Sequence, residues 1–345
     1  MFSNLPARAA LNVKQRMDRG IQSPDYIKNI AQSAVPKTAK LAFDDGKSIG
    51  VENTPKGPPI KRVEVLFGGT NMTARQSMNT SNTDYGDMIK ETDHLAVFKS
   101  KDGHTLHVLV DGPGAFRDNG NVQGYGQECD MLRYGHYAHG NITGRGQGGM
   151  EQNTKMAAEL LNELSEAKQI DRSTAIDIIG FSRGGVSGGN FTHDAVKYSD
   201  NVTFDGRDPV PGPSNDHNLV IHPDVKQARV QFSETNRAPF FFSPRIENVS
   251  NITVTNGGHG SRAGERFDKP LPEDPGVYIE GAEEGDFTKV HSREEAKAML
   301  GNPDTTSSYQ PVDDNFAGDI LRDTDDYRHM TFMEAIGDYF EKQKK

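Results

Sequence analysis

The stretch IDIIGFSRGG, residues 176–185, decides the fold. An isoleucine-rich run stops at Gly180, and Ser182 and two further glycines follow before a segment with helical character. A strand, then Gly-x-Ser-x-Gly, then a helix is typical of a nucleophile elbow, which lifts a serine hydroxyl above the edge of a sheet. Glycines suit this turn because side chains there would collide with the neighbouring strand and helix. Ser182 is therefore the candidate nucleophile, and an ordinary strand–helix turn is the alternative.

The composition excludes several classes of protein. Of the 345 residues 26% are charged and 34% hydrophobic, and the net charge of −10 argues against non-specific nucleic-acid binding. A single cysteine, Cys129, excludes an internal disulfide and a cysteine-based zinc site, and it indicates folding in a reducing compartment. No run of about 18 apolar residues is present, and the N-terminus lacks the apolar segment of a secretory signal peptide. Any peripheral membrane contact would therefore use apolar or locally basic surface.

Short β-type segments and amphipathic helical segments alternate along the chain. The patterns predict strands at 62–67, 95–98, 105–110, 176–179, 201–204, 227–232 and 251–254, and helices at 150–167, 292–300 and 330–342. This alternation predicts an α/β fold with a mostly parallel central sheet, helices on both faces and loop-rich insertions.

Two stretches stand apart in composition. Residues 1–58 are interpreted as an N-terminal extension that packs on the core or engages a partner, and 59–345 as one catalytic domain. Within that domain, residues 264–326 are rich in proline, glycine and acidic residues. We interpret 264–326 as a loop-rich insertion and a candidate lid.

A serine nucleophile needs a histidine base and an acid that orients the histidine. In the α/β-hydrolase order the acid and then the histidine follow the serine, each just after a strand. Asp205 and Asp208 both follow the predicted strand at 201–204, so either one is a candidate acid. His259 is flanked by glycines after the predicted strand at 251–254 and is the candidate base, and His329 before the last predicted helix is the alternative base.

The oxyanion of an acyl-transfer reaction needs backbone N–H donors. The residue after the nucleophile, Arg183, supplies one donor, and Gly69 or Thr70 after the first predicted strand supplies the second. Residues 68–70 can also be interpreted simply as a tight turn, and such a turn can at the same time supply the N–H donor.

Motifs for cofactors and metals are incomplete. The glycine-rich stretch 144–149 is not followed by the Lys-Ser/Thr of a phosphate loop. The acidic residues between Asp313 and Asp326 lack the spacing of a calcium-binding EF-hand loop. We therefore expect no cofactor and no metal.

Taken in order, the motifs of residues 62–265 resemble the α/β-hydrolase domain family that includes the phospholipase effectors of bacterial type VI secretion systems. The segments that carry the resemblance are FGGTN at 67–71, VDGPG at 110–114, GFSRG at 180–184, FDGRDPV at 204–210, FSETNR at 232–237 and GGHGS at 257–261. Asp208 is favoured over Asp205 because Asp-Pro-Val follows a family-like apolar step.

The resemblance implies a serine esterase, a phospholipase A or lipase that acts on membrane phospholipids as an antibacterial or host-directed toxin. It also implies synthesis in the bacterial cytoplasm without a signal peptide, delivery into a target cell, a secretion-apparatus partner and an immunity protein. Two alternatives stay open. One is a soluble carboxylesterase acting on small or carbohydrate acyl esters, and the other is a non-catalytic binding or adaptor protein on a hydrolase scaffold.

Overall fold

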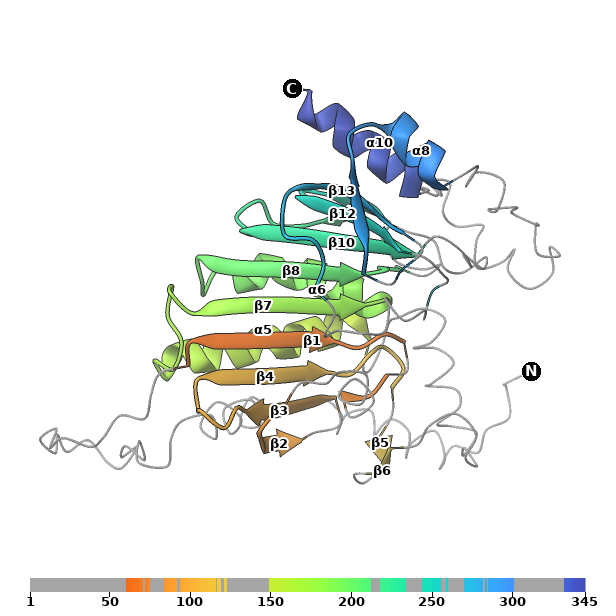
Figure 1. Cartoon of the computed structure of the whole chain (residues 1–345). Helices are drawn as coiled ribbons and strands as arrows, with labels where there is room; N and C mark the ends of the chain where they lie inside the picture. Colours follow the sequence, from red (N-terminus) through yellow and green to blue (C-terminus); the bar gives the residue numbers. More distant parts are fainter. Residues whose placement is uncertain are drawn as a thin grey trace, which may run out of the picture.

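The central element is a ten-stranded sheet (Figure 1). The computed structural model describes residues 60–70, 72–74, 84–91, 94–115, 117–118, 121–122, 149–211, 218–233, 244–255, 259, 270–281, 283, 285–300 and 332–344. In sheet order the strands are β14 (Phe287–Val290), β13 (Gly276–Glu280), β12 (Asn251–Thr255), β10 (Gln227–Ser233), β8 (Asn201–Arg207), β7 (Ala175–Phe181), β1 (Arg62–Phe67), β4 (Thr105–Val110), β3 (Leu95–Lys99) and β2 (Asp87–Glu91).

Every neighbouring pair from β13 to β4 is parallel. The edges differ, because β14 is antiparallel to β13, and β3 is antiparallel to both β4 and β2. The strands β2 and β3 come between β1 and β4 in the sequence but lie outside β4 in the sheet. The predicted mostly parallel sheet is confirmed, and all seven predicted strands are present.

Several strands were not predicted. The strands β13 and β14 lie inside the stretch 264–326, which therefore contributes to the sheet. Residues 264–269, 282, 284 and 301–326 of this stretch lie outside the described residues. Two small sheets, β9 (Asn218–Val220) with β11 (Arg245–Glu247) and β5 (Arg117–Asp118) with β6 (Asn121–Val122), complete the described strands. The extension 1–58 lies outside the described residues.

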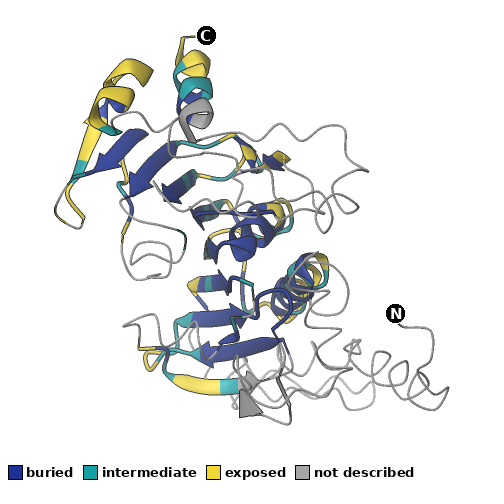
Figure 2. Ribbon diagram, turned by 90° about the vertical axis from the view of Figure 1, so that its right-hand side faces the viewer, coloured by how far each residue is buried: buried dark blue, intermediate teal, exposed yellow. Residues whose placement is uncertain are grey.

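The described helices are amphipathic and cover one face of the sheet, and no helix on the other face, as the prediction of helices on both faces requires, is among the described residues. The helices α5 (Met150–Glu166) and α6 (Arg183–Ala195) lie side by side on this face (Figure 2). The apolar positions predicted for the first of them are buried: Met156, Ala157, Leu160, Leu161 and Leu164. The helix α10 (Phe332–Gln343) packs on the same face over β10 and β12, beside α8 (Arg293–Leu300). None of the described helices is long and apolar enough to cross a membrane.

The two faces of the sheet differ in chemistry. In parallel strands, residues in register point to the same side, so Val65, Ile178 and Phe204 form one apolar layer under α6. The opposite face carries polar side chains along β8, β10 and β12, among them Asp205 and Gln231. The extended segment 270–274 contacts this polar face at the start of β10 and β12 through its carbonyl groups.

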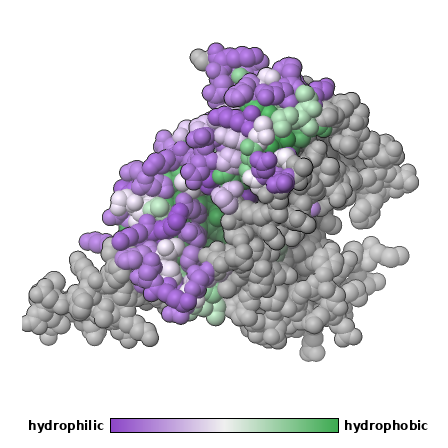
Figure 3. Space-filling model, viewed as in Figure 1, coloured by the Kyte–Doolittle hydropathy of each residue, from purple (hydrophilic) through white to green (hydrophobic). Residues whose placement is uncertain are grey.

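The surface seen from the side of Figure 1 is largely polar over the described residues (Figure 3). Apolar residues gather near α8 in this view (Figure 3). Met299 of α8 is 43% exposed. The larger of the two apolar clusters of the described residues lies between the sheet and the helices.

Candidate active site

Ser182 lies in the sharp turn between β7 and α6, at the N-cap of the helix. Its backbone has φ 56° and ψ −125°, a left-handed conformation that costs energy for a residue other than glycine. Gly184 makes the turn feasible, because a Cβ there would lie 2.2 Å from the carbonyl oxygen of Phe67. The Gly-x-Ser-x-Gly pattern is thus explained by close backbone approach, and the turn has the shape of a nucleophile elbow.

His259 lies between Ser182 and Asp208 and contacts both. Its Nε2 atom is 2.9 Å from Oγ of Ser182, and its Nδ1 atom is 2.8 Å from Oδ2 of Asp208. If Nδ1–H donates to the carboxylate, Nε2 is left to accept the serine hydroxyl proton. The structure therefore brings the three residues selected from the sequence into one hydrogen-bonded chain.

Asp208 is fixed by the backbone of the neighbouring strand. It follows β8 directly, has φ 44°, and is 2% exposed. Its N–H donates to the carbonyl of Gln231 at 2.8 Å, and its Oδ1 accepts the N–H of Ser233 at 3.1 Å. One carboxylate oxygen is therefore occupied by β10, and the other faces the imidazole.

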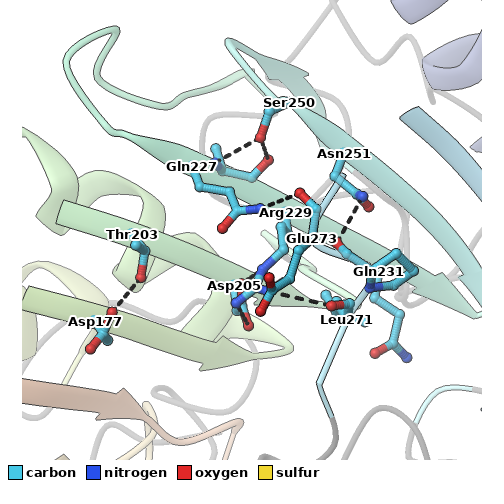
Figure 4. Close-up of polar contacts among 12 residues, drawn as sticks. Asp177, Thr203, Asp205, Gln227, Arg229, Gln231, Ser250, Asn251, Leu271 and Glu273 are labelled. Atoms are coloured by element: carbon cyan, nitrogen blue, oxygen red, sulfur yellow. Dashed lines mark hydrogen bonds and ion pairs between the residues drawn. The ribbon is translucent and has the colours of Figure 1, made fainter. Parts of the chain in front are cut away.

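Asp205, the alternative acid, lies elsewhere. Its side chain projects from the polar face of the sheet, where Oδ2 accepts a hydrogen bond from Nη2 of Arg229 at 2.8 Å (Figure 4). Nη2 of Arg207 lies 3.7 Å from the same oxygen. Asp205 is thus engaged by two guanidinium groups, while Asp208 contacts the histidine. His329, the alternative base, lies outside the described residues.

The backbone donors predicted for an oxyanion lie beside the elbow. Arg183 is the first residue of α6, so its N–H is at the positive end of the helix dipole. Gly69 lies against Phe181, because a Cβ at Gly69 would be 2.7 Å from that ring. Within the described part of the chain, the N–H groups of Gly69 and Thr70 make no hydrogen bond to a backbone carbonyl.

The side chain of Arg183 is unusual for a residue next to a nucleophile, because it is only 6% exposed. Burial lowers the pKa of its guanidinium to about 10, since the protein interior disfavours the charged form. The elbow therefore carries a desolvated cation in addition to a strained backbone.

Two contributors to the site were not found from the sequence. Phe181 stacks on the imidazole of His259, with ring centroids 5.0 Å apart. Ser233 contributes through its backbone N–H, which gives no residue-type signal. The only available sequence cue for Ser233 was its place at the carboxyl end of a predicted strand.

Comparisons with known proteins give only distant structural likeness. No protein-family model matches the chain, and no curated protein matches it either. The Tle1 effector bound to the VgrG spike of the type 6 secretion system is similar at 12% identity and a TM-score of 0.35, over 67% of this chain and 56% of that chain. The chain thus spans little more than half of that structure's length.

Two hydrolase structures are similar at a lower TM-score. A predicted CIB-like hydrolase from Thermoplasma acidophilum is 15% identical over 59% of this chain and 80% of its own, with a TM-score of 0.29. The Bacillus cereus carboxylesterase is 14% identical over 58% and 81%, with the same TM-score. Likeness at this level carries no inference about activity. On its parallel strand order and on the elbow between β7 and α6, the chain has the α/β-hydrolase fold.

Proposed function

We propose that the chain is a serine esterase in which Ser182 is the nucleophile, His259 the general base and Asp208 the acid that orients the base. The observation that carries this proposal is the continuous hydrogen-bonded chain from Ser182 Oγ through the imidazole to Asp208. Its members come from the ends of three parallel strands, β7, β8 and β12, which is where α/β sheets hold their ligands.

The geometry supports acyl transfer in two stages. His259 Nε2 takes the proton of Ser182 as Oγ bonds to the ester carbonyl carbon, and Asp208 stabilises the imidazolium that forms. The N–H groups of Arg183 and of Gly69 or Thr70 hold the oxyanion. The intermediate then collapses, and His259 returns the proton to the leaving alcohol. Water, deprotonated by the same imidazole, attacks the acyl-serine and releases the carboxylic acid.

The substrate class proposed is a phospholipid, cleaved as by a phospholipase A or lipase. The support is the resemblance carried by residues 67–71, 180–184 and 204–210 to phospholipase effectors. On the same support we propose delivery to a target cell as a toxin, with a secretion-apparatus partner and an immunity protein. The esterase chemistry is argued from the site, whereas the lipid and the delivery are argued from the resemblance.

Labelling with a fluorophosphonate probe tests the esterase proposal, because the probe phosphonylates an activated serine. The wild type is expected to label, and Ser182→Ala is expected not to. Ser187→Ala is the matched control, since Ser187 is a buried serine within α6 and its loss should leave labelling intact. A folded wild-type chain that fails to label would overturn the proposal.

A comparison of two substrates separates the phospholipase from a soluble carboxylesterase. We expect fatty-acid release from a phospholipid to rise steeply once the lipid forms micelles, while hydrolysis of a short acyl ester stays slower. A rate with phospholipid that does not change at the micellar threshold would favour the carboxylesterase. Expression in the bacterial periplasm tests the toxin role, since growth should stop with the wild type and continue with Ser182→Ala.

A further inference from the structure

A group of polar residues crosses three adjacent strands on the face of the sheet opposite α6. We call Asp205, Arg207, Arg229, Gln231 and Thr255 the buried polar ladder. Arg207, Gln231 and Thr255 are each at most 2% exposed, and the side chain of Arg229 is 15% exposed. The ladder lies on β8, β10 and β12, the three strands whose ends surround Asp208 and lead to His259.

The ladder is continuous across the strands. Arg229 binds Asp205 through two nitrogens, and Nη1 of Arg207 donates to Oε1 of Gln231 at 3.2 Å. Nε2 of Gln231 donates in turn to Oγ1 of Thr255 at 3.0 Å. Figure 4 shows Asp205, Arg229 and Gln231 projecting from their strands on the same side of the sheet. Side-chain contacts therefore join β8 to β10 and β10 to β12, in addition to the backbone hydrogen bonds between these strands.

Each strand of the ladder reaches the site within a few residues. Arg207 directly precedes Asp208, and its carbonyl accepts the N–H of Ser182 at 2.9 Å. Gln231 accepts the N–H of Asp208 through its own carbonyl. Thr255 ends β12 four residues before His259 in the sequence. The side chains of the ladder thus connect the backbone segments that hold the nucleophile, the acid and the base.

A buried charged network is a costly way to hold a sheet together. Burial of ions carries a desolvation penalty, and apolar residues of similar volume often give equal or greater stability. Satisfied polar networks instead specify one arrangement of the groups they join, because hydrogen bonds are directional. The apolar layer on the other face already supplies the packing of these same strands.

We infer that the buried polar ladder sets the positions of Asp208 and Ser182 relative to His259, with Arg207, Gln231 and Thr255 as positioning residues. The inference rests on the proposed esterase function. A misplacement of about 1 Å in a catalytic constellation costs on the order of a hundredfold in rate. Small shifts between β8, β10 and β12 are therefore expected to affect turnover more than substrate binding.

Two threonines on β12 provide a matched test. Thr255 and Thr253 lie on the same face and are both buried, but Thr253 donates to Asn251 and is outside the ladder. With a short acyl ester, we expect Thr255→Val to lower kcat by about tenfold and to leave KM nearly unchanged. The pH profile of kcat/KM is expected to shift because the hydrogen bond between Asp208 and His259 changes its geometry. Thr253→Val should keep the kcat and the pH profile of the wild type, although both variants lose thermal stability.

A second variant keeps the test decisive. Gln231→Met removes the link between Arg207 and Thr255, and it should lower kcat at least as much as Thr255→Val. The double variant should be no slower than Gln231→Met alone, because the hydrogen bond between Gln231 and Thr255 is already lost in that variant. If Gln231→Met does not fold, the two threonine variants decide.

The outcomes separate this inference from the proposed function. A wild type that neither labels with the fluorophosphonate probe nor hydrolyses the ester would overturn the proposed function and the positioning role with it. An active wild type combined with full kcat and an unchanged pH profile in Thr255→Val would overturn the ladder inference alone. A loss of kcat in Thr253→Val as large as that in Thr255→Val would also overturn the ladder inference, because Thr253 is outside the ladder.

Discussion

The ring of Phe181 is stacked on the imidazole of His259, with centroids 5.0 Å apart and planes inclined by 20°. Phe181 is the residue directly before Ser182, so one β-strand end carries both the serine and the surface on which the histidine rests. The same ring lies against Gly69, which joins the candidate base to the turn after β1. The position of the imidazole is thus defined by an apolar contact as well as by its two hydrogen bonds.

Replacement of this ring should slow the reaction. A stacked aromatic pair contributes about 0.5–1.5 kcal/mol beyond its buried area, so we expect Phe181→Leu to lower kcat by roughly two- to tenfold. Steady-state hydrolysis of a short acyl ester measures the effect. Phe98→Leu is the control, because Phe98 is a similarly buried ring of the same apolar cluster that lies tilted against Tyr85 and does not contact the histidine ring. Equal kcat values in the two variants would contradict a role for the stacking.

The two candidate acids should respond differently to loss of charge. Asp208→Asn is expected to lower kcat by about 10⁴-fold, because the amide favours the wrong imidazole tautomer. Asp205→Asn leaves Arg229 partly buried without its carboxylate and should lower the free energy of unfolding by about 3–5 kcal/mol. Its kcat should fall far less. Ester hydrolysis and urea unfolding of both variants provide the measurement. A larger loss of kcat in Asp205→Asn than in Asp208→Asn would identify Asp205 as the acid.

The buried cation at the elbow should make stability depend on pH in the alkaline range. Burial lowers the pKa of Arg183 to about 10, so the unfolded chain holds the proton more readily than the folded one. The cost of burying the charge is fully present below pH 10 and disappears as the pH rises above 10. The free energy of unfolding of the wild type should therefore gain a contribution above pH 10 that Arg183→Met lacks. Urea denaturation checks this, with the exposed Arg172→Met as a control that changes little.

The contact between Glu64 of β1 and His107 should make the stability of the fold depend on pH in the acidic range. Burial raises the pKa of Glu64, but the hydrogen bond and charge of His107 and the charge of Arg62 outweigh burial and lower that pKa below 4.5. A lowered folded-state pKa gives stability that is present above pH 4.5 and is lost as the pH falls through the folded value.

Glu64→Gln is the variant that tests this acid dependence. Because Glu64 is partly exposed, we expect the wild type to exceed this variant by less than about 1 kcal/mol near pH 6, and by nothing near pH 3. Thermal unfolding across this pH range provides the measurement. A constant difference between the two proteins at all pH values would exclude a contribution from the Glu64 charge.

The central part of the fold could be predicted because its signals are local. The strand before Ser182 and the helix after it follow from an apolar run, two glycines and helical periodicity within 20 residues. The strands β2, β13 and β14 lacked such signals. β13 and β14 lie in a stretch rich in turn-forming and acidic residues, and the register of β2 with β3 shifts between Met88 and Lys90. The two outermost strands, β14 and β2, pair on one side only, so apolar alternation is weaker there.

The choice between Asp205 and Asp208 depends on distant residues. Asp205 pairs in register with Arg229, which follows it by 24 positions. No pattern around Asp205 shows that a guanidinium from another strand will bind it. Ser233 and Phe181 likewise act through a backbone group and a ring face, so residue type alone gave no reason to select them.

The chemical difference between the two faces of the sheet also constrains how the chain folds. Side chains alternate along a strand, so a slip of β10 by one residue would turn Arg229 and Gln231 into the apolar layer and Val230 out of it. Such a misaligned sheet would bury an unpaired guanidinium beneath α6 and α10, which is strongly unfavourable. The polar face therefore rejects incorrect strand alignments during folding, in addition to any part it has in the finished site.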